Sequence, residues 1–212
     1  MKKNKSTIIH DTIALFAISL GCVLALSFVY EITKAPILQQ EMNKKLEAYQ
    51  VVYQDAVNLK EDIELNEQAA AVSMVSLDSS FATAKIDEVN QAYDGNDNLI
   101  GYIVKVSNRG YSGQITMVLG YSVEGEVQGL EIIAINDTAG LGDRVTEADF
   151  RNQFINKTAD KFVTSKTEAT ADNEINAITG ATISTDGVVN GVNAAIAFLT
   201  EYAGNIGGGA NE

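Results

Sequence analysis

The N-terminal part of the chain contains one long apolar run. Residues 12–30 include no charged side chain. At about 1.5 Å per residue, a helix over this run spans roughly 28 Å, close to the hydrocarbon thickness of a bilayer. The run is longer than the usual apolar region of a cleaved signal peptide, and no small-x-small cleavage site follows it. We therefore predict a transmembrane helix over residues 12–30.

The charges around this run predict its orientation. Lys2, Lys3 and Lys5 precede it, and the residues that follow it show no such excess of positive charge. By the positive-inside rule, residues 1–11 are expected in the cytoplasm. The rest of the chain is then expected on the outer side of the cell membrane.

After the apolar run, the spacing of apolar residues is first that of a helix and then shows little periodicity. Apolar residues recur with the spacing of one helical face, so residues 31–56 are predicted to form a helical stalk. Residues 57–98 are acidic, rich in Ala, Ser and Asn, and weakly periodic. We interpret them as a loosely determined leader into a sheet, ending in the turn sequence of residues 94–98.

Three later runs have the composition of strands. Residues 100–106, 115–121 and 130–135 are rich in β-branched residues or tyrosine and are bounded by glycine. Their short spacing predicts an antiparallel meander. Phe150 and Phe154, four positions apart, predict a short helix after the last of these strands.

The last strongly periodic segment predicts a C-terminal helix. Its apolar positions follow Ser184, Thr185 and Asp186, which are typical N-cap residues, and they are Val188, Val189, Val192, Ala195, Ile196 and Leu199. Residues 207–212 are glycine-rich and predict a flexible tail. The fold class is therefore α+β, with one globular domain over residues 57–206.

Composition narrows the chemistry of that domain. The formal charge of the chain is -13, and setting aside Asp11 and the three N-terminal lysines leaves 27 acidic and 12 basic residues beyond residue 30. A charge of -15 argues against a nucleic-acid partner. Cys22 and His10 are the only residues of their types, and both precede the domain. The domain therefore has no residues for a thiolate metal site, a cysteine-ligated cluster or His-based catalysis. Electron transfer by this domain would need an organic cofactor.

One segment suits a phosphate group. Residues 179–185 are a run of hydroxyl-bearing and small residues that leads directly into the predicted C-terminal helix. The first turn of a helix exposes unpaired N–H groups and the positive end of the helix dipole, and Gly180 and Ala181 let an anion approach the backbone. By the residues alone, an ordinary Ser/Thr-rich capping loop is the alternative.

The same residues resemble a known motif. Thr179-Gly180-Ala181-Thr182 is similar to the S/T-G-A-T flavinylation motif of the FMN-binding domain family. The resemblance implies that a flavin transferase joins the phosphate of FMN to Thr182 as a phosphoester, with Ser184 and Thr185 as less favoured acceptors. The family usually has an acidic residue three positions before the motif, where this chain has Asn176.

A second segment resembles the same family. Asp137-Thr138-Ala139-Gly140-Leu141-Gly142 is similar to its E-T-P-G-L-G segment, and residues 110–113 are similar to its glycine-tyrosine loop. The resemblance implies that Thr138, Gly140 and Leu141 form a wall of the flavin site; a tight turn after a strand is the alternative. The two motifs occur in the expected order, and residues 30–37 are similar to the family's N-terminal anchor. The resemblance therefore covers nearly the whole chain except residues 57–98. Three tyrosines of the predicted strands and loops could either stack on a flavin or pack in the core: Tyr102, Tyr111 and Tyr121.

The resemblance also implies a role. Within this family, a single N-terminal anchor and a short chain are most similar to G subunits of the Rnf complex, an ion-translocating ferredoxin:NAD+ oxidoreductase. It implies an electron-relay subunit with covalent FMN and no independent catalysis. Its partners would be other membrane subunits of the complex, a flavin transferase and the lipid around residues 12–30. The alternatives are a C subunit of a sodium-translocating NADH:quinone oxidoreductase, a stand-alone membrane-tethered FMN-binding module, and a cofactor-free structural subunit.

Overall fold

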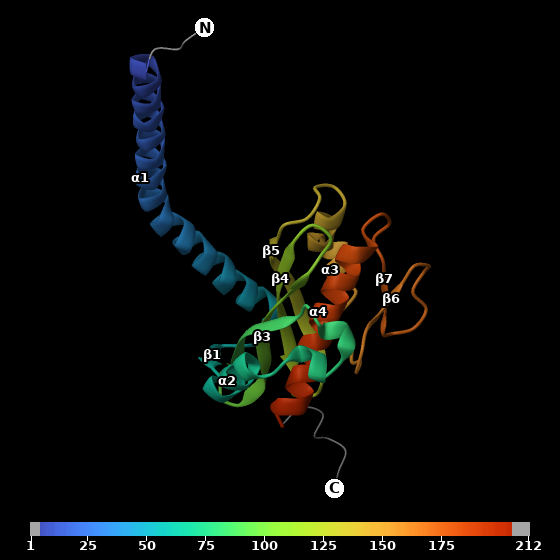
Figure 1. Cartoon of the computed structure of the whole chain (residues 1–212). Coiled ribbons are helices and arrows are strands. Elements are labelled where there is room, and N and C mark those ends of the chain that lie inside the picture. The colour runs from blue at the N-terminus through green and yellow to red at the C-terminus, as the bar shows by residue number, and fades with distance from the viewer. Residues whose placement is uncertain (1–4, 205–212) are drawn as a thin grey trace. The chain divides into compact units, whose positions relative to one another are not determined.

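The computed structural model describes residues 5–204 (Figure 1). Lys2, Lys3 and the predicted tail at residues 207–212 therefore lie outside the described residues. The chain divides after Lys45 into two compact units.

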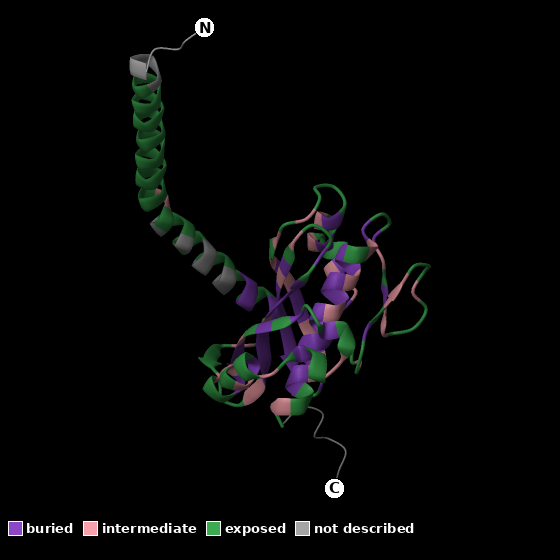
Figure 2. Ribbon diagram, in the orientation of Figure 1, coloured by how far each residue is buried: buried purple, intermediate pink, exposed green. Residues whose placement is uncertain are grey.

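A long helix, α1 (Lys5–Val52), forms the first unit and enters the second. Its segment Ile9–Lys34 is apolar and long enough to cross a membrane, and none of its residues is buried (Figure 2). Apolar side chains with no protein cover are what a bilayer-spanning helix presents to lipid. The predicted N-terminal apolar helix is confirmed.

The second unit is built on an antiparallel sheet whose strands follow one another in sequence order. The three strands expected from composition are present in the predicted meander, each a few residues longer than expected. The strands are β1 (Asn58–Glu61), β2 (Lys85–Tyr93), β3 (Leu99–Arg109), β4 (Gln114–Ser122) and β5 (Val127–Ile135).

The interpretation of residues 57–98 as a loosely determined leader is wrong. This region supplies two strands of the sheet, β1 and β2, and between them α2 (Ile63–Ala71) and two short 3-10 helices, η1 (Met74–Ser76) and η2 (Ser79–Phe81). Ile86 and Val89 of β2 are buried in the core. An irregularity in the pairing with β3 separates them, between Ile86 and Glu88, and it breaks the alternation of period two by which a strand is recognised.

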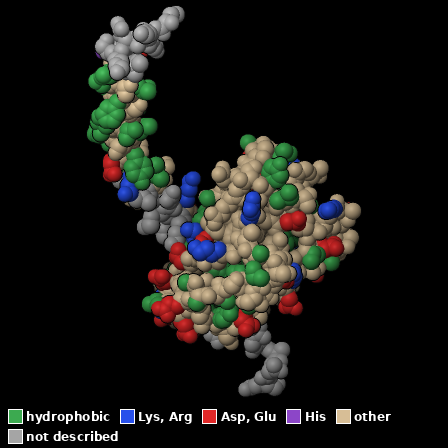
Figure 3. All heavy atoms as spheres, viewed as in Figure 1, with side chains coloured by type: hydrophobic (Ala, Val, Ile, Leu, Met, Phe, Trp, Pro, Cys, Tyr) green, Lys and Arg blue, Asp and Glu red, His purple; other side chains and the backbone are tan. Residues whose placement is uncertain are grey.

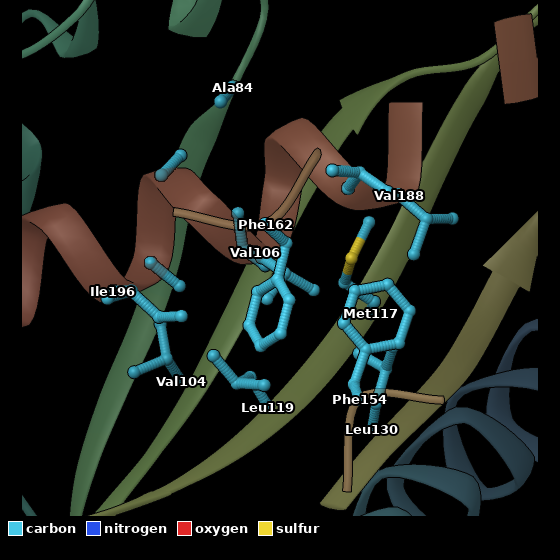
Figure 4. Packing of buried hydrophobic residues seen from close by; sticks show 14 of the residues in the cluster. Ala84, Val104, Val106, Met117, Leu119, Leu130, Phe154, Phe162, Val188 and Ile196 are labelled. Carbon is cyan, nitrogen blue, oxygen red and sulfur yellow. The ribbon is translucent and has the colours of Figure 1, made fainter. Parts of the chain in front are cut away.

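The main core lies between one face of the sheet and α4 (Thr182–Tyr202). Alternate residues of β3 and β4 point to this face, and the predicted apolar positions of α4 pack on them. Figure 4 shows Val188 and Ile196 of α4 grouped with Met117, Val104 and Leu119 of the strands. The intervening strand residues, Ile103 and Val118, belong to a second cluster on the opposite face.

The end of α1 covers this opposite face. Tyr49, Val52 and Tyr53 are buried there, and the Tyr53 hydroxyl donates a hydrogen bond to the carbonyl oxygen of Ile100 at 2.6 Å. The compact unit accordingly begins at Leu46, whereas the sequence predicted a stalk to residue 56 and a domain from residue 57.

The chain beyond β5 closes the edge of the core. Phe150 and Phe154 stack edge to face with a centroid distance of 5.8 Å. The predicted short helix is present as α3 (Ala148–Arg151), which contains Phe150 and ends before Phe154. Asn193 of α4 is buried and bonds both the N–H and the carbonyl of Phe162 at 2.8 Å. The elements of this part are η3 (Gly142–Thr146), α3 (Ala148–Arg151), and a parallel pair that the sequence did not reveal, β6 (Val163–Ser165) and β7 (Glu174–Asn176).

Candidate functional site

A cavity of about 550 Å³ lies where three segments far apart in sequence meet. They are the loop between β3 and β4, the loop after β5, and the first turn of α4. The lining residues are Tyr111, Asp137, Thr138, Leu141, Gly142, Gly180, Ala181, Thr182, Ile183 and Ser184. Both motifs found in the sequence therefore contribute to one site.

The first turn of α4 has the geometry of an anion site. The helix begins at Thr182, and in the described part of the chain no side chain caps its N-terminus, because the N-cap position is held by Ala181. The first N–H groups of a helix have no partner within the helix, so a phosphate can take the place of a cap. Gly180 has φ +82°, a left-handed conformation that favours glycine.

This helix begins earlier than the sequence predicted. Ser184, Thr185 and Asp186 were expected as N-cap residues but lie inside the first turns of α4. The Thr185 hydroxyl donates to the carbonyl oxygen of Ala181 at 3.1 Å and accepts from the N–H of Ile178 at 3.2 Å. These two hydrogen bonds hold the loop before the helix against its first turn, and the N-cap position is Ala181.

The three hydroxyls of this turn differ in what they contact. Thr185 is fully buried and engaged as described, and Ser184 is buried and donates to Asp137 at 2.6 Å. The Thr182 hydroxyl makes no hydrogen bond within residues 5–204, and its side chain is half-buried on the cavity wall. Thr182 thus carries the one hydroxyl of this turn that has no hydrogen-bond partner among the described residues.

Asp137 connects the three segments. Its Oδ1 accepts hydrogen bonds from the N–H groups of Thr138 at 2.9 Å and Ser112 at 3.2 Å. Its Oδ2 accepts from the N–H of Tyr111 at 3.1 Å and from the Ser184 hydroxyl at 2.6 Å. Burial alone would raise the pKa of this carboxyl, but the four hydrogen bonds outweigh burial and hold the pKa below its ordinary value. The group is a carboxylate at neutral pH.

The remaining candidates divide into lining and supporting residues. Thr138 and Leu141 line the cavity, as does Tyr111, whereas Tyr102 and Tyr121 are buried in the core. Thr179 and Gly140 are exposed and lie outside the lining.

Four lining residues were not among the predicted site residues: Asp137, Gly142, Ile183, and Tyr111, which the sequence left open between stacking and core packing. The signal for Asp137 is its place as the first residue of the second motif, two positions after the end of β5. Nothing in the local pattern distinguished Ile183 from a core residue, yet 55% of its surface is exposed at the rim.

Asn176, which departs from the family pattern, has a structural role: it forms hydrogen bonds that hold a neighbouring loop. Its Oδ1 accepts from the N–H of Ala169 at 2.7 Å, and its own N–H donates to Oε1 of Gln153 at 2.7 Å. The side chain thereby fixes the loop between β6 and β7, ahead of the motif.

Comparison with known proteins places the cavity within a known domain. Residues 110–197 match the FMN-binding domain family, and this range contains every lining residue. The chain is 31% identical over 187 residues to the G subunit of the Na+-translocating ferredoxin:NAD+ oxidoreductase complex of Acetobacterium woodii, covering 86% of each chain. It is 27% identical to the G subunit of the ion-translocating oxidoreductase complex of Shewanella piezotolerans, covering 93% of this chain and 92% of that one.

A solved structure shares the fold. The C subunit of the Na+-translocating NADH-quinone reductase from Parabacteroides distasonis superposes with a TM-score of 0.51 at 16% identity, over 77% of this chain and 96% of that one. With the sequence matches above, this chain belongs to the family of G subunits of ion-translocating oxidoreductase complexes, and its residues 110–197 form an FMN-binding domain.

Proposed function

We propose that this chain is an electron-relay subunit that carries FMN as a phosphoester on Thr182, within an ion-translocating ferredoxin:NAD+ oxidoreductase complex. The observation that carries the proposal is the state of the Thr182 hydroxyl. It lies on the wall of a cavity in the FMN-binding domain, at an uncapped helix N-terminus, while the two neighbouring hydroxyls are buried and engaged.

The residues present fit this cofactor. The N–H groups at the start of α4 suit its phosphate, and Tyr111, Leu141 and Ile183 offer exposed apolar surface to an aromatic ring. Once bound, FMN supplies one- and two-electron chemistry. The chain itself contributes the attachment point, the orientation and the shielding.

In the attachment step a bond would form between Thr182 Oγ1 and the flavin phosphate, and the hydroxyl proton would pass to solvent. A flavin dinucleotide such as FAD would supply the whole FMN group: its pyrophosphate bond would break, and AMP would leave. The flavin ring takes no part in this step, so its redox chemistry is retained.

The N-terminal helix and the similar proteins support a proposal for the membrane topology and the partners of the chain. We propose that the chain crosses the membrane once, with its N-terminus in the cytoplasm and the FMN-binding domain outside. Its partners are then the other membrane subunits of the complex, the flavin transferase that matures it, and the lipid around α1. The similarity to the C subunit of the NADH-quinone reductase concerns the fold, whereas the higher sequence identity and the larger matched share of this chain favour the G subunits.

The test is covalent flavin in the full-length protein. Coexpression with a flavin transferase should give a band that fluoresces in a denaturing gel, and Thr182→Val should abolish the fluorescence while the protein remains in the membrane. Thr200→Val is the matched control, because Thr200 is an exposed threonine at the other end of α4. Wild-type protein without covalent flavin would overturn the proposal, as would a Thr182→Val band that stays fluorescent until Ser184 or Thr185 is changed.

A further inference from the structure

We propose that Asp137 is the positioning residue of this site. Its carboxylate holds the first turn of α4 and the loop that carries Tyr111 around Thr182 before any flavin is attached. The inference rests on the proposed attachment at Thr182 and adds a second residue, which contacts the acceptor turn through Ser184. Without it, the three walls of the cavity have no common hydrogen-bond partner among the described residues.

The surroundings of Asp137 are shaped to receive it. A Cβ atom at Gly142 would lie 2.6 Å from Asp137 Cγ and 2.7 Å from the Ser184 hydroxyl oxygen. A Cβ atom at Gly110 would lie 2.8 Å from Asp137 Oδ2. A residue other than glycine at either position would force the carboxylate or another neighbour to move; at Gly110 the other neighbour is Ile115, whose Cδ1 would also lie 2.8 Å from the added Cβ. The two glycines flank the carboxylate, one from each loop.

The chemistry of the network requires a carboxylate. Each oxygen of Asp137 accepts two hydrogen bonds, and all four partners are donors. An amide of the same shape keeps one acceptor oxygen and turns an NH2 group toward two donors. Asp137→Asn therefore preserves volume but turns its NH2 group toward backbone N–H donors in either orientation: the N–H of Tyr111, or those of Ser112 and Thr138. The Ser184 hydroxyl can reverse and accept, but a backbone N–H cannot. In either case the loop that carries Tyr111 and Ser112 loses one of its two hydrogen bonds to residue 137, and the charge that strengthens the others is removed.

Flavin transfer to purified protein tests this role. Full-length apo-protein, produced without a flavin transferase, is incubated in detergent with purified transferase and FAD, and covalent flavin is followed by in-gel fluorescence. A misplaced acceptor slows the chemical step more than it weakens docking of the chain, so Asp137→Asn should lower kcat roughly 10- to 100-fold with little change in KM. Asp149→Asn, an exposed carboxylate of α3, is the matched control and should transfer at the wild-type rate.

A double-mutant cycle separates positioning from general damage. Ser184→Ala removes the donor and leaves the carboxylate, so it should lower kcat less than Asp137→Asn, and the two changes together should be less than multiplicative. Thermal unfolding of each apo-protein shows that the variants are folded at the assay temperature.

If wild type and Asp137→Asn accept flavin equally fast, the role of Asp137 is overturned while attachment at Thr182 stands. If both single variants match wild type in kcat and differ only in unfolding temperature, the role is overturned as well. If wild type accepts no flavin, the proposed function itself fails.

Discussion

At the scale of single residues, the site is defined by what each hydroxyl contacts. Ser184, Thr185 and Thr182 are chemically similar and close together in sequence. Their difference comes from their partners: Asp137, 47 positions away, for Ser184, and the loop directly before the helix for Thr185. An acceptor hydroxyl must be both reachable and free of competing hydrogen bonds, and Thr182 meets both conditions within the described chain.

Asp137 also makes the stability of the site depend on pH. Burial raises the pKa of this carboxyl and its hydrogen bonds lower it further than burial raises it, so the folded-state pKa lies below the ordinary value of 3.8. The stabilisation is therefore fully present above the unfolded-state pKa and is lost as pH falls through the folded-state pKa. We expect the unfolding temperature of wild type to drop more steeply than that of Asp137→Asn between about pH 5 and about pH 2. Parallel curves for the two proteins would contradict this.

At the scale of elements, the sheet depends on a helix end that the sequence assigned to a stalk. Gly101, Gly120 and Gly129 lie on neighbouring strands, on the face that Val52 and Tyr53 cover. A Cβ atom at Gly120 would lie 2.2 Å from the carbonyl oxygen of Val52, and one at Gly129 would lie 2.5 Å from its Cα. The end of α1 can approach the strands this closely because side chains are absent there.

Gly120→Ala should therefore destabilise the domain. The added methyl group would displace the end of α1 from the sheet, and overpacking of this kind costs about 1–3 kcal/mol. Chemical unfolding of the purified full-length protein in detergent measures the loss. Gly95→Ala serves for comparison, because a Cβ atom at Gly95 would meet only Val57 Cγ2, at 3.9 Å. Equal stability of the two variants would show that the helix end moves away without cost.

At the scale of the whole molecule, charge and hydrophobicity are segregated. The apolar segment Ile9–Lys34 has a high mean hydropathy, whereas the residues beyond it carry the excess of acidic groups. Figure 3 shows Asp and Glu side chains distributed over the visible face of the domain, with fewer Lys and Arg. Such a surface favours solubility outside a membrane and opposes binding to anionic surfaces.

A reporter fusion tests the predicted orientation. Alkaline phosphatase folds to an active enzyme only outside the cytoplasm, so its fusion after residue 204 should be active in cells. Replacing Lys2, Lys3 and Lys5 by glutamate should lower that activity, because the positive charge that retains the N-terminus inside is removed. Deletion of residues 12–30 should abolish it. An inactive fusion to the intact chain would reverse the assigned topology.

Several features of this protein follow from local sequence pattern alone. The apolar N-terminal helix, the meander of β3 to β5 and the core face of α4 follow from hydrophobic periodicity, which is a property of neighbouring residues. The resemblance of two short motifs also placed the chain in its family before any fold was known. Each of these features can be predicted from a short stretch of neighbouring residues.

Other features depend on contacts between residues far apart in the sequence. β2 joins the sheet although an irregular pairing with β3 hides its alternation. Asp137 becomes the junction of the site only when residues 47 positions apart in sequence, such as Asp137 and Ser184, share one hydrogen bond. Local sequence cannot encode these features, because their free energy comes from partners that only folding brings together.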